Sequence, residues 1–430
     1  MKRTDMDKSI RTAVNFITIS AAITALVPTA TAQVANLDSA PQNVFENESE
    51  ESLAKYLSLG PVSVRPHLNV SAYYDDNLTL KDGPELEDFV WRISPGALFG
   101  AGEFRDKGNY VTLDYTPTAA FYTKYSEYNS LDHMVDFNAG WKMSKLTLGI
   151  GQSYEIANGK QIEASAFVEQ ESFVTKLTSM YEFSEKTSAE LNGRQMLIDS
   201  TDRVIKGADT RLNTINQWEI EGWGNYKQTE KLTLGAGVIV GWRDIVGHTS
   251  PSVQDVVDTP NQAFQQVAVR SAYDVSEKLE VSGSLGLFFS QFQDGDDKGP
   301  TLVFNLAGSW RPLENTFVSA EAYRRDFPSY STAGQTYTAT GFRTSVRQRL
   351  FDKYTASIAT GYENSDYSNT GGTAGADRTD DYFWIRPAFD CEFTERCNAG
   401  VFYQFRTKSS DNSAVEYSNN QLGVYTNYKF

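Results

Sequence analysis

The sequence predicts an all-β protein, a transmembrane antiparallel up-and-down β-barrel of about 18 strands, with about 16 strands as the next choice. Three observations support this fold class. The chain ends on an alternating aromatic strand, extended alternating segments recur through most of its length, and long connections alternate with short ones. Alternating segments of about 11 to 15 residues are typical of membrane-crossing strands and exceed the strands of a soluble sandwich. We therefore expect short periplasmic turns and long extracellular loops.

The first 32 residues have the pattern of a secretory signal peptide. A basic start, Met1–Arg11, precedes the mostly apolar run Ala13–Val27, and Ala30–Ala32 has the small-x-small form of a cleavage site. Removing this segment takes away a net charge of +2, so the mature chain carries −18 where the full chain carries −16. The chain is therefore expected to be an acidic protein secreted across the inner membrane of a Gram-negative bacterium.

The composition fits a barrel and argues against other classes. No later run approaches the roughly 18 apolar residues of a membrane helix, and the mean hydropathy is −0.44. An aromatic content of 13% and 31 glycines fit many strands with aromatic belts around a wet lumen. The acidic balance argues against nucleic acid as a partner. The predicted organisation is residues 1–32 as signal peptide, 33–62 as an acidic flexible periplasmic extension and 63–430 as the barrel.

Apolar residues that alternate with polar ones mark the predicted strands. In chain order these are Leu68–Tyr74, Phe89–Phe99, Val111–Phe121, Val135–Trp141, Leu146–Ile150, Phe173–Phe183, Ala189–Gly193, Trp218–Tyr226, Leu232–Trp242, Val267–Tyr273, Leu279–Phe289, Leu302–Trp310, Val318–Ala322, Phe342–Val346, Tyr354–Tyr362, Phe383–Phe389, Ala399–Phe405 and Gln421–Phe430. Long loops are expected at 75–88, 157–170, 197–213, 246–261 and 364–380. Strands that run toward the short turns end in aromatic residues, which predicts an inner interfacial girdle of Phe99, Trp141, Phe183, Tyr226, Tyr273, Trp310, Phe389 and Phe430.

The last strand should close the barrel against the first. An open apolar edge at a chain end invites aggregation, whereas a closed barrel has no such edge. An ordinary sheet strand at a chain end is the alternative. Tyr428 and the terminal Phe430 resemble the C-terminal signal of outer-membrane barrels, which the barrel-assembly machinery reads.

Charged residues between the outward apolar ones should line the lumen. Two predicted groups, one basic and one acidic, would set up a transverse field that orients polar solutes. The alternative is that these charges pair with their neighbours. The predicted pore-lining residues are Arg270, Arg325, Arg343, Arg347, Arg349, Arg386, Glu190, Glu219 and Glu221.

The two cysteines, Cys391 and Cys397, lie across a predicted turn. If Phe389 faces Ala399 in this hairpin, the cysteines face each other, and a disulfide follows in an oxidising compartment. We expect no redox catalysis from them.

Two short motifs stand near the start of the predicted barrel. Tyr73–Leu78 reads Tyr-Tyr-Asp-Asp-Asn-Leu, and Ile93–Gly96 reads Ile-Ser-Pro-Gly. This pair of motifs resembles the β-barrel porin 2 family of bacterial outer-membrane proteins. The likeness to that family would cover nearly all of the mature chain. Because its members resemble proteins of exopolysaccharide loci, the resemblance implies a role in saccharide passage. The motif residues are Tyr74, Asp75, Asp76 and Asn77, and on physical grounds they form a polar transition from strand to loop.

The favoured function is an outer-membrane channel for hydrophilic solutes, since about 18 strands leave an aqueous interior. Its expected partners are outer-membrane lipids, the barrel-assembly machinery and a polar solute or polysaccharide. A lipase- or protease-type barrel enzyme and a structural or adhesive barrel with a closed lumen are the alternatives. His133 is the sole candidate base for an enzyme, and we expect no catalytic residue, cofactor or metal site. The acidic run at Asp294, Asp296 and Asp297 lacks the distant Glu of a calcium loop.

Overall fold

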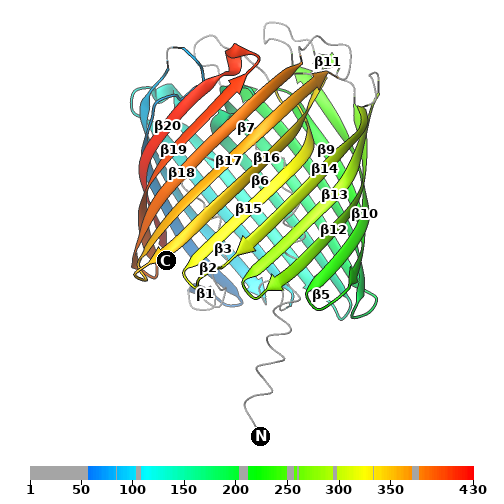
Figure 1. Ribbon diagram of the computed structural model, residues 1–430. Coiled ribbons are helices and arrows are strands. Elements are labelled where there is room, and N and C mark those ends of the chain that lie inside the picture. The colour runs from blue at the N-terminus through cyan, green and yellow to red at the C-terminus, as the bar shows by residue number, and fades with distance from the viewer. Residues whose placement is uncertain are drawn as a thin grey trace.

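The computed structural model is a closed antiparallel β-barrel (Figure 1). The structure describes residues 57–83, 85–102, 108–202, 212–248, 256–258, 261–293, 298–332, 334–369 and 377–430. The signal peptide, most of the acidic extension and the acidic run at Asp294 lie outside these ranges. Two of the described strands are three-residue pieces, β1 and β11, and the other 18 form the wall, which confirms the predicted fold class and strand number.

The strands of the wall are 13 to 17 residues long in the described ranges. In chain order the strands are β1 (Leu57–Leu59), β2 (Val62–Asp75), β3 (Asp88–Gly102), β4 (Tyr110–Tyr122), β5 (Ser130–Lys142), β6 (Leu146–Gln161), β7 (Ala166–Glu182), β8 (Thr187–Asp202), β9 (Thr214–Lys227), β10 (Leu232–His248), β11 (Val256–Asp258), β12 (Gln262–Ser276), β13 (Leu279–Phe292), β14 (Lys298–Trp310), β15 (Thr316–Pro328), β16 (Gln335–Leu350), β17 (Tyr354–Asn369), β18 (Arg378–Thr394), β19 (Cys397–Ser410) and β20 (Tyr417–Lys429). Within the described ranges, two single-turn 3₁₀ helices, η3 (Ser126–Tyr128) and η4 (Ser413–Val415), lie in loops. No helix in the described part of the chain is long and apolar enough to cross a membrane.

Sequential strands pair around the barrel, and β20 closes it against β2 from Lys429↔His67 to Gln421↔Asp75. The amide of the last residue, Phe430, donates to the Pro66 carbonyl at 3.0 Å. Below that point β1 pairs with β2, so a short strand occupies part of the range predicted as a flexible extension. The predicted pairing of the last strand with the first is confirmed.

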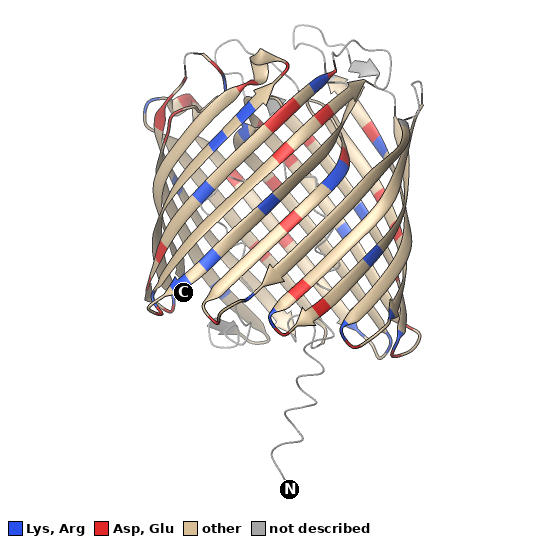
Figure 2. Cartoon of the chain, viewed as in Figure 1, with Lys and Arg blue, Asp and Glu red and all other residues tan. Residues whose placement is uncertain are grey.

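Connections differ in length between the two ends, which we call the lower rim, with short turns, and the upper rim, with longer loops (Figures 1 and 2). Figure 2 shows acidic and basic residues in the short turns of the lower rim. One predicted long loop, 157–170, is wrong: β6 and β7 continue as a ladder to Gln161↔Ala166 and leave only four residues, 162–165, between them. This segment is polar because β6 and β7 continue above the apolar band that contacts lipid.

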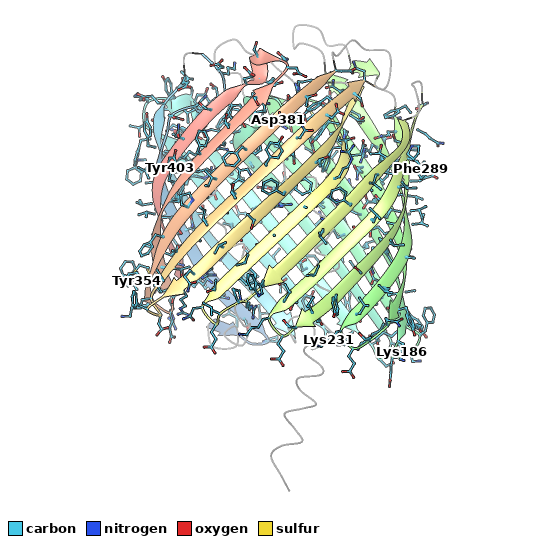
Figure 3. All side chains as sticks on the ribbon, viewed as in Figure 1. Lys186, Lys231, Phe289, Tyr354, Asp381 and Tyr403 are labelled. Carbon is cyan, nitrogen blue, oxygen red and sulfur yellow. The ribbon has the colours of Figure 1, made fainter. Side chains whose placement is uncertain are left out.

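Large apolar side chains cover the outer face of the wall. Tyr403, Tyr354 and Phe289 project outward in Figure 3, and all three are exposed. The predicted lower girdle is confirmed, because each of its eight residues, Phe99, Trp141, Phe183, Tyr226, Tyr273, Trp310, Phe389 and Phe430, is an exposed large apolar residue. In water such a surface would aggregate, whereas in a membrane it is the required contact with lipid.

The predicted disulfide is wrong, because Cys391 and Cys397 are free thiols. The register of β18 and β19 is displaced by two residues from the prediction, so Cys391 faces Ala399 and Phe389 faces Val401. A bulge between Glu392 and Thr394 lets the strands run further and shortens the turn. The cysteines are then diagonal neighbours at about 7 to 8 Å, beyond the reach of a disulfide.

We expect both thiols to remain free in the mature protein. Denaturation without reductant, followed by alkylation and peptide mapping, should find both Cys391 and Cys397 alkylated. Prior reduction serves as the control and should not increase the labelling. A linked peptide that appears only before reduction would contradict the β18–β19 register.

Candidate functional site

All nine charged residues predicted to line the lumen lie on the inward face of their strands. On β12, outward Val267 and Val269 alternate with inward Ala268 and Arg270, and the ladder registers carry this alternation to neighbouring strands. The nine are Glu190 on β8, Glu219 and Glu221 on β9, Arg270 on β12, Arg325 on β15, Arg343, Arg347 and Arg349 on β16, and Arg386 on β18.

Several of the inward charges form ion pairs with neighbouring side chains, and one of these pairs joins the predicted basic and acidic groups. Arg270 Nη2 donates to Glu190 Oε1 at 2.6 Å, which joins the two predicted groups. On β15 and β16, Glu321 accepts from Arg325 Nη2 and from Arg343 Nε, each at 2.6 Å. Of the two sequence interpretations, the structure therefore favours local ion pairs over a transverse field.

Three of the other predicted site residues, Arg349, Tyr428 and Phe430, lie near the lower rim. Arg349 Nη2 donates to Glu392 Oε2 at 3.0 Å on the exposed rim. Tyr428 and Phe430 lie at the closing seam with ring centroids 4.5 Å apart and an interplanar angle of 80°. Arg386 sits higher on β18, where its guanidinium carbon lies 4.3 Å from the ring centroid of Phe402.

Two hairpin tips meet at the upper end of the lumen, which we call the mouth. The β6–β7 tip carries Glu163, which is 2% exposed, and the β15–β16 tip carries Ser329, Tyr330 and Ser331. The Glu163 carboxylate accepts from both serine hydroxyls, at 2.5 and 2.8 Å, and from the amides of Tyr330 and Ser331, at 3.0 and 3.1 Å. A buried carboxylate needs such donors, because each unmet bond would carry its full desolvation cost.

The β15–β16 tip also packs against the far wall. Tyr330 is buried in an apolar cluster with Val174, Met196, Ile198, Ile215 and Ile245. Burial raises the pKa of the Tyr330 phenol, so the ring stays neutral. The Asn213 amide donates to the Tyr330 carbonyl at 2.7 Å, and Asn213 Nδ2 donates to the Ser329 carbonyl at 2.9 Å. The tip therefore crosses the lumen and is fixed at its far side.

The β6–β7 tip is fixed by contacts with β18 to β20 and with loops at the upper rim. Lys408 on β19 donates to the carbonyls of Ile162 and Glu163 at 2.8 and 3.1 Å, and Ser165 Oγ donates to the Val415 carbonyl. Ile162 packs with Leu80, Tyr382 and Tyr417. Both tips are therefore ordered parts of the barrel interior, and together they narrow the mouth.

The motif Tyr73–Leu78, which resembles the porin 2 family, forms hydrogen bonds across the closing seam between β2 and β20, beside the mouth. We call these contacts the clasp. Asp75, which is 1% exposed, accepts from Lys160 Nζ at 2.5 Å, Asn419 Nδ2 at 2.8 Å and Gln421 Nε2 at 2.7 Å. Asp76 accepts from the Asn420 amide at 2.7 Å. Further along the motif, the Asn77 side chain donates to two backbone carbonyls, while Tyr74 points outward and donates to Glu87. The motif thus joins β2 to β20 and, through Lys160, to β6.

Sequence reasoning missed Glu163, Tyr330 and Lys160 because it placed Lys160 and Glu163 in a long loop and gave Tyr330 no role. A glutamate between Ile162 and Ala164, in an otherwise small and apolar stretch, is the signal that could have indicated a buried anchor. Its four donors come from a hairpin more than 160 positions away, and no local pattern shows such a contact.

His67 and His133 lie apart on different strands of the barrel, β2 and β5. His133 lies on the outer face of β5, stacked on Tyr115 with ring centroids 6.2 Å apart. His67 Nε2 contacts Thr116 Oγ1 at 3.0 Å. The described residues contain no group of three or more His, Cys, Asp or Glu that could hold a metal ion.

An apolar outer wall with an aromatic girdle and an inner wall that carries many polar and charged side chains define this chain as a transmembrane β-barrel with a polar lumen. No family model and no curated protein matches the chain, so the family resemblance rests on its short motifs alone.

Solved β-barrels resemble the chain distantly. OccK2 (OpdF) of Pseudomonas aeruginosa, solved with glucuronate, has 10% identity and a TM-score of 0.45 over 85% of this chain and 98% of that one. OpdQ of the same organism has 10% identity and a TM-score of 0.45 over 86% and 100%. The siderophore receptor PirA of Acinetobacter baumannii has 9% identity and a TM-score of 0.43 over 85% and 80%. Likenesses at this level carry no argument about function, which must come from the chain's own geometry.

The clasp at the closing seam should contribute strongly to stability. Asp75→Asn removes the carboxylate that pairs with buried Lys160, and breaking such a buried pair costs about 3 to 5 kcal/mol. Urea unfolding, followed by heat-modifiable migration of the folded barrel in gels, measures the change. Lys124→Gln is the control, since it breaks the exposed pair with Glu87 and should leave the unfolding midpoint unchanged. Equal midpoints for Asp75→Asn and the wild type would show that the clasp is not stabilising.

Proposed function

We propose that the protein is a porin-like channel of the outer membrane that passes small polar solutes through a narrowed mouth. The observation that carries this proposal is the meeting of two hairpin tips on Glu163 inside a closed barrel whose inner wall is polar. A barrel of about 18 strands encloses an aqueous interior unless loops or side chains fill it. Here the tips reduce the opening at one level, and half-buried charges line the lumen below it.

The outer-membrane location is part of the proposal. It is supported by the apolar outer face, the lower aromatic girdle and the closed ladder, which together meet the requirements of a lipid-spanning barrel. Saccharide passage, including polysaccharide export, is a narrower form of the same hypothesis. Its support is the motif resemblance, and a bulky polymer would require the tips to leave the mouth.

Single-channel conductance in planar bilayers tests the channel and the role of the tips. Wild-type protein should conduct in small steps, because the tips limit the cross-section at the mouth. Replacing residues 329–334 by a two-residue Asn-Gly turn should raise the step size several-fold. Glu163→Ala should give unstable steps with larger openings, because the β15–β16 tip loses its anchor. Glu185→Gln, at an exposed lower turn, is the matched control. An absence of steps from all four proteins would instead support a structural barrel with a closed lumen.

The arginines of β16 should influence ion preference. Arg343 and Arg347 share the lumenal face, and Arg343 is 42% exposed there. Ion choice in a pore depends on charges near the path, so the double substitution Arg343→Gln/Arg347→Gln should shift the reversal potential toward cation preference in a salt gradient. Conductance-competent barrels with an unchanged reversal potential would show that the ion path avoids this part of the wall. Arg311→Gln, in the lower β14–β15 turn, controls for loss of charge elsewhere.

A further inference from the structure

The wall of the barrel is incomplete between β14 and β15. These strands pair only from Trp310↔Val318 to Phe304↔Arg324. Above that level, Lys298–Val303 of β14 pairs with β13 alone, and Arg325–Pro328 of β15 pairs with β16 alone. Figure 1 shows β14 and the β15–β16 hairpin diverging toward the upper rim.

The inward bend of the β15–β16 hairpin explains this gap. The β15–β16 ladder is continuous from Thr316↔Gln348 to Pro328↔Thr336, and the β16–β17 ladder is continuous as well. Since β15 stays with β16, the displacement that carries the tip into the mouth separates β15 from β14. The same bend therefore narrows the mouth and opens the wall.

The gap begins within the apolar band. Phe304, at the last ladder pair, faces Leu285 on β13, which precedes the exposed aromatic Phe289 by four residues. Lipid cannot satisfy free backbone groups, so an interrupted ladder at this depth must line a cavity that admits polar groups. One backbone carbonyl of the stretch, that of Asp326, accepts from Arg243 Nη2 across the lumen at 3.4 Å.

A cavity of about 230 Å³ lies behind the gap, and residues from both faces of the wall line it. Its lining is mixed, because the charged side chains of Glu219, Arg243 and Arg270 border it beside the apolar ones. Phe304 and Arg324 belong to the outward face, while Phe264, Phe288 and Val303 form a buried apolar cluster on the lumenal side. This cluster is one of several in the barrel interior, and Arg243 lies over it, with its guanidinium carbon 4.6 Å from the Phe264 ring centroid. The volume is below the roughly 300 to 1,000 Å³ of sites for drug-sized molecules, so it suits one end of a narrow chain.

Arg324 marks the outer edge of this cavity. It alternates with inward Tyr323 and Arg325, and its Nη1 donates to Thr340 Oγ1 at 2.7 Å. It makes no ion pair with any residue in the described ranges, whereas Arg325 pairs with Glu321. An outward arginine in the apolar band is costly unless another group meets its charge. Its guanidinium is a planar fork that matches a carboxylate or phosphate oxyanion.

We propose that the gap between β14 and β15 is a lateral portal that binds an acyl-chain amphiphile with a single anionic head. The head lies at Arg324, and the chain enters between Phe304 and Phe327 to reach the apolar cluster of Phe264, Phe288 and Val303. This site differs from the polar path through the mouth, and it does not require that path to conduct.

Photo-crosslinking in bilayer nanodiscs tests the portal. The probe is a long-chain fatty acid that carries a diazirine at the end of its chain, and mass spectrometry locates the labelled residues. We expect labels on the lumenal peptides that contain Phe264 and Phe288. Arg324→Gln should reduce this labelling several-fold, and Arg324→Lys should retain most of it. The methyl ester of the same probe should label several-fold less, because it lacks the anionic head.

The controls separate the portal from ordinary lipid contact. Arg311→Gln, at the lower end of the same two strands, should label like the wild type, and heat-modifiable migration verifies that each variant is folded. A phosphatidylglycerol with the same diazirine chain gives the second arm: stronger lumenal labelling by this lipid identifies a lipid headgroup as the source, and stronger labelling by the fatty acid identifies a free carboxylate. Labels confined to outward residues such as Leu302 and Phe304, or equal lumenal labelling in Arg324→Gln, would overturn the portal. Conductance of the same variants shows separately whether the channel is intact.

Discussion

The structure depends on one constraint, that a wall in lipid must satisfy its backbone hydrogen bonds within itself. The ladder from β2 around to β20 meets this constraint almost everywhere, and Phe430 supplies the last bond of the seam with the Pro66 carbonyl. Closure then fixes the alternation of side chains, because residues that follow one another point to opposite faces. The apolar exterior and the charged lumen both follow from that alternation.

A closed wall alone would leave a wide lumen, and the narrowed mouth needs a second device. Two strand pairs extend past the apolar band and turn inward, where a buried carboxylate takes hydrogen bonds from the opposing tip. Glu163 is suited to this position because its two oxygens can accept all four donors, whereas a Gln side chain would bring its own donors to the same place. The apolar cluster around Tyr330 fixes the β15–β16 tip, and the hydrogen bonds from Lys408 fix the β6–β7 tip. The mouth is therefore part of the folded core.

The sequence could predict whatever is encoded by local alternation. Strand number, the lower girdle, the closing strand and the inward facing of residues such as Arg270 and Arg343 all follow from a period of two. The β18–β19 register could not be predicted, since the bulge near Glu392 depends on the turn and displaces the pairing without changing the faces. The bent tips were also missed, because the roles of Glu163 and Tyr330 depend on contacts between hairpins that are distant in the sequence. Polar residues in a rising strand look the same as polar residues in a loop.

The bend of β15 and β16 links the mouth to the wall. If the tip leaves Glu163, β15 can return to β14 and extend their ladder beyond Phe304↔Arg324, which would close the gap as the mouth widens. The inward arrangement keeps the anchor bonds and the Tyr330 seat, whereas the outward arrangement gains ladder bonds. Because neither arrangement would satisfy both sets, the two positions of the hairpin would compete. A ligand that binds only to the open wall would stabilise the inward arrangement, and so the narrowed mouth, because it binds that arrangement more tightly. By linkage, a solute that binds only when the mouth is wide would lower the affinity for that ligand.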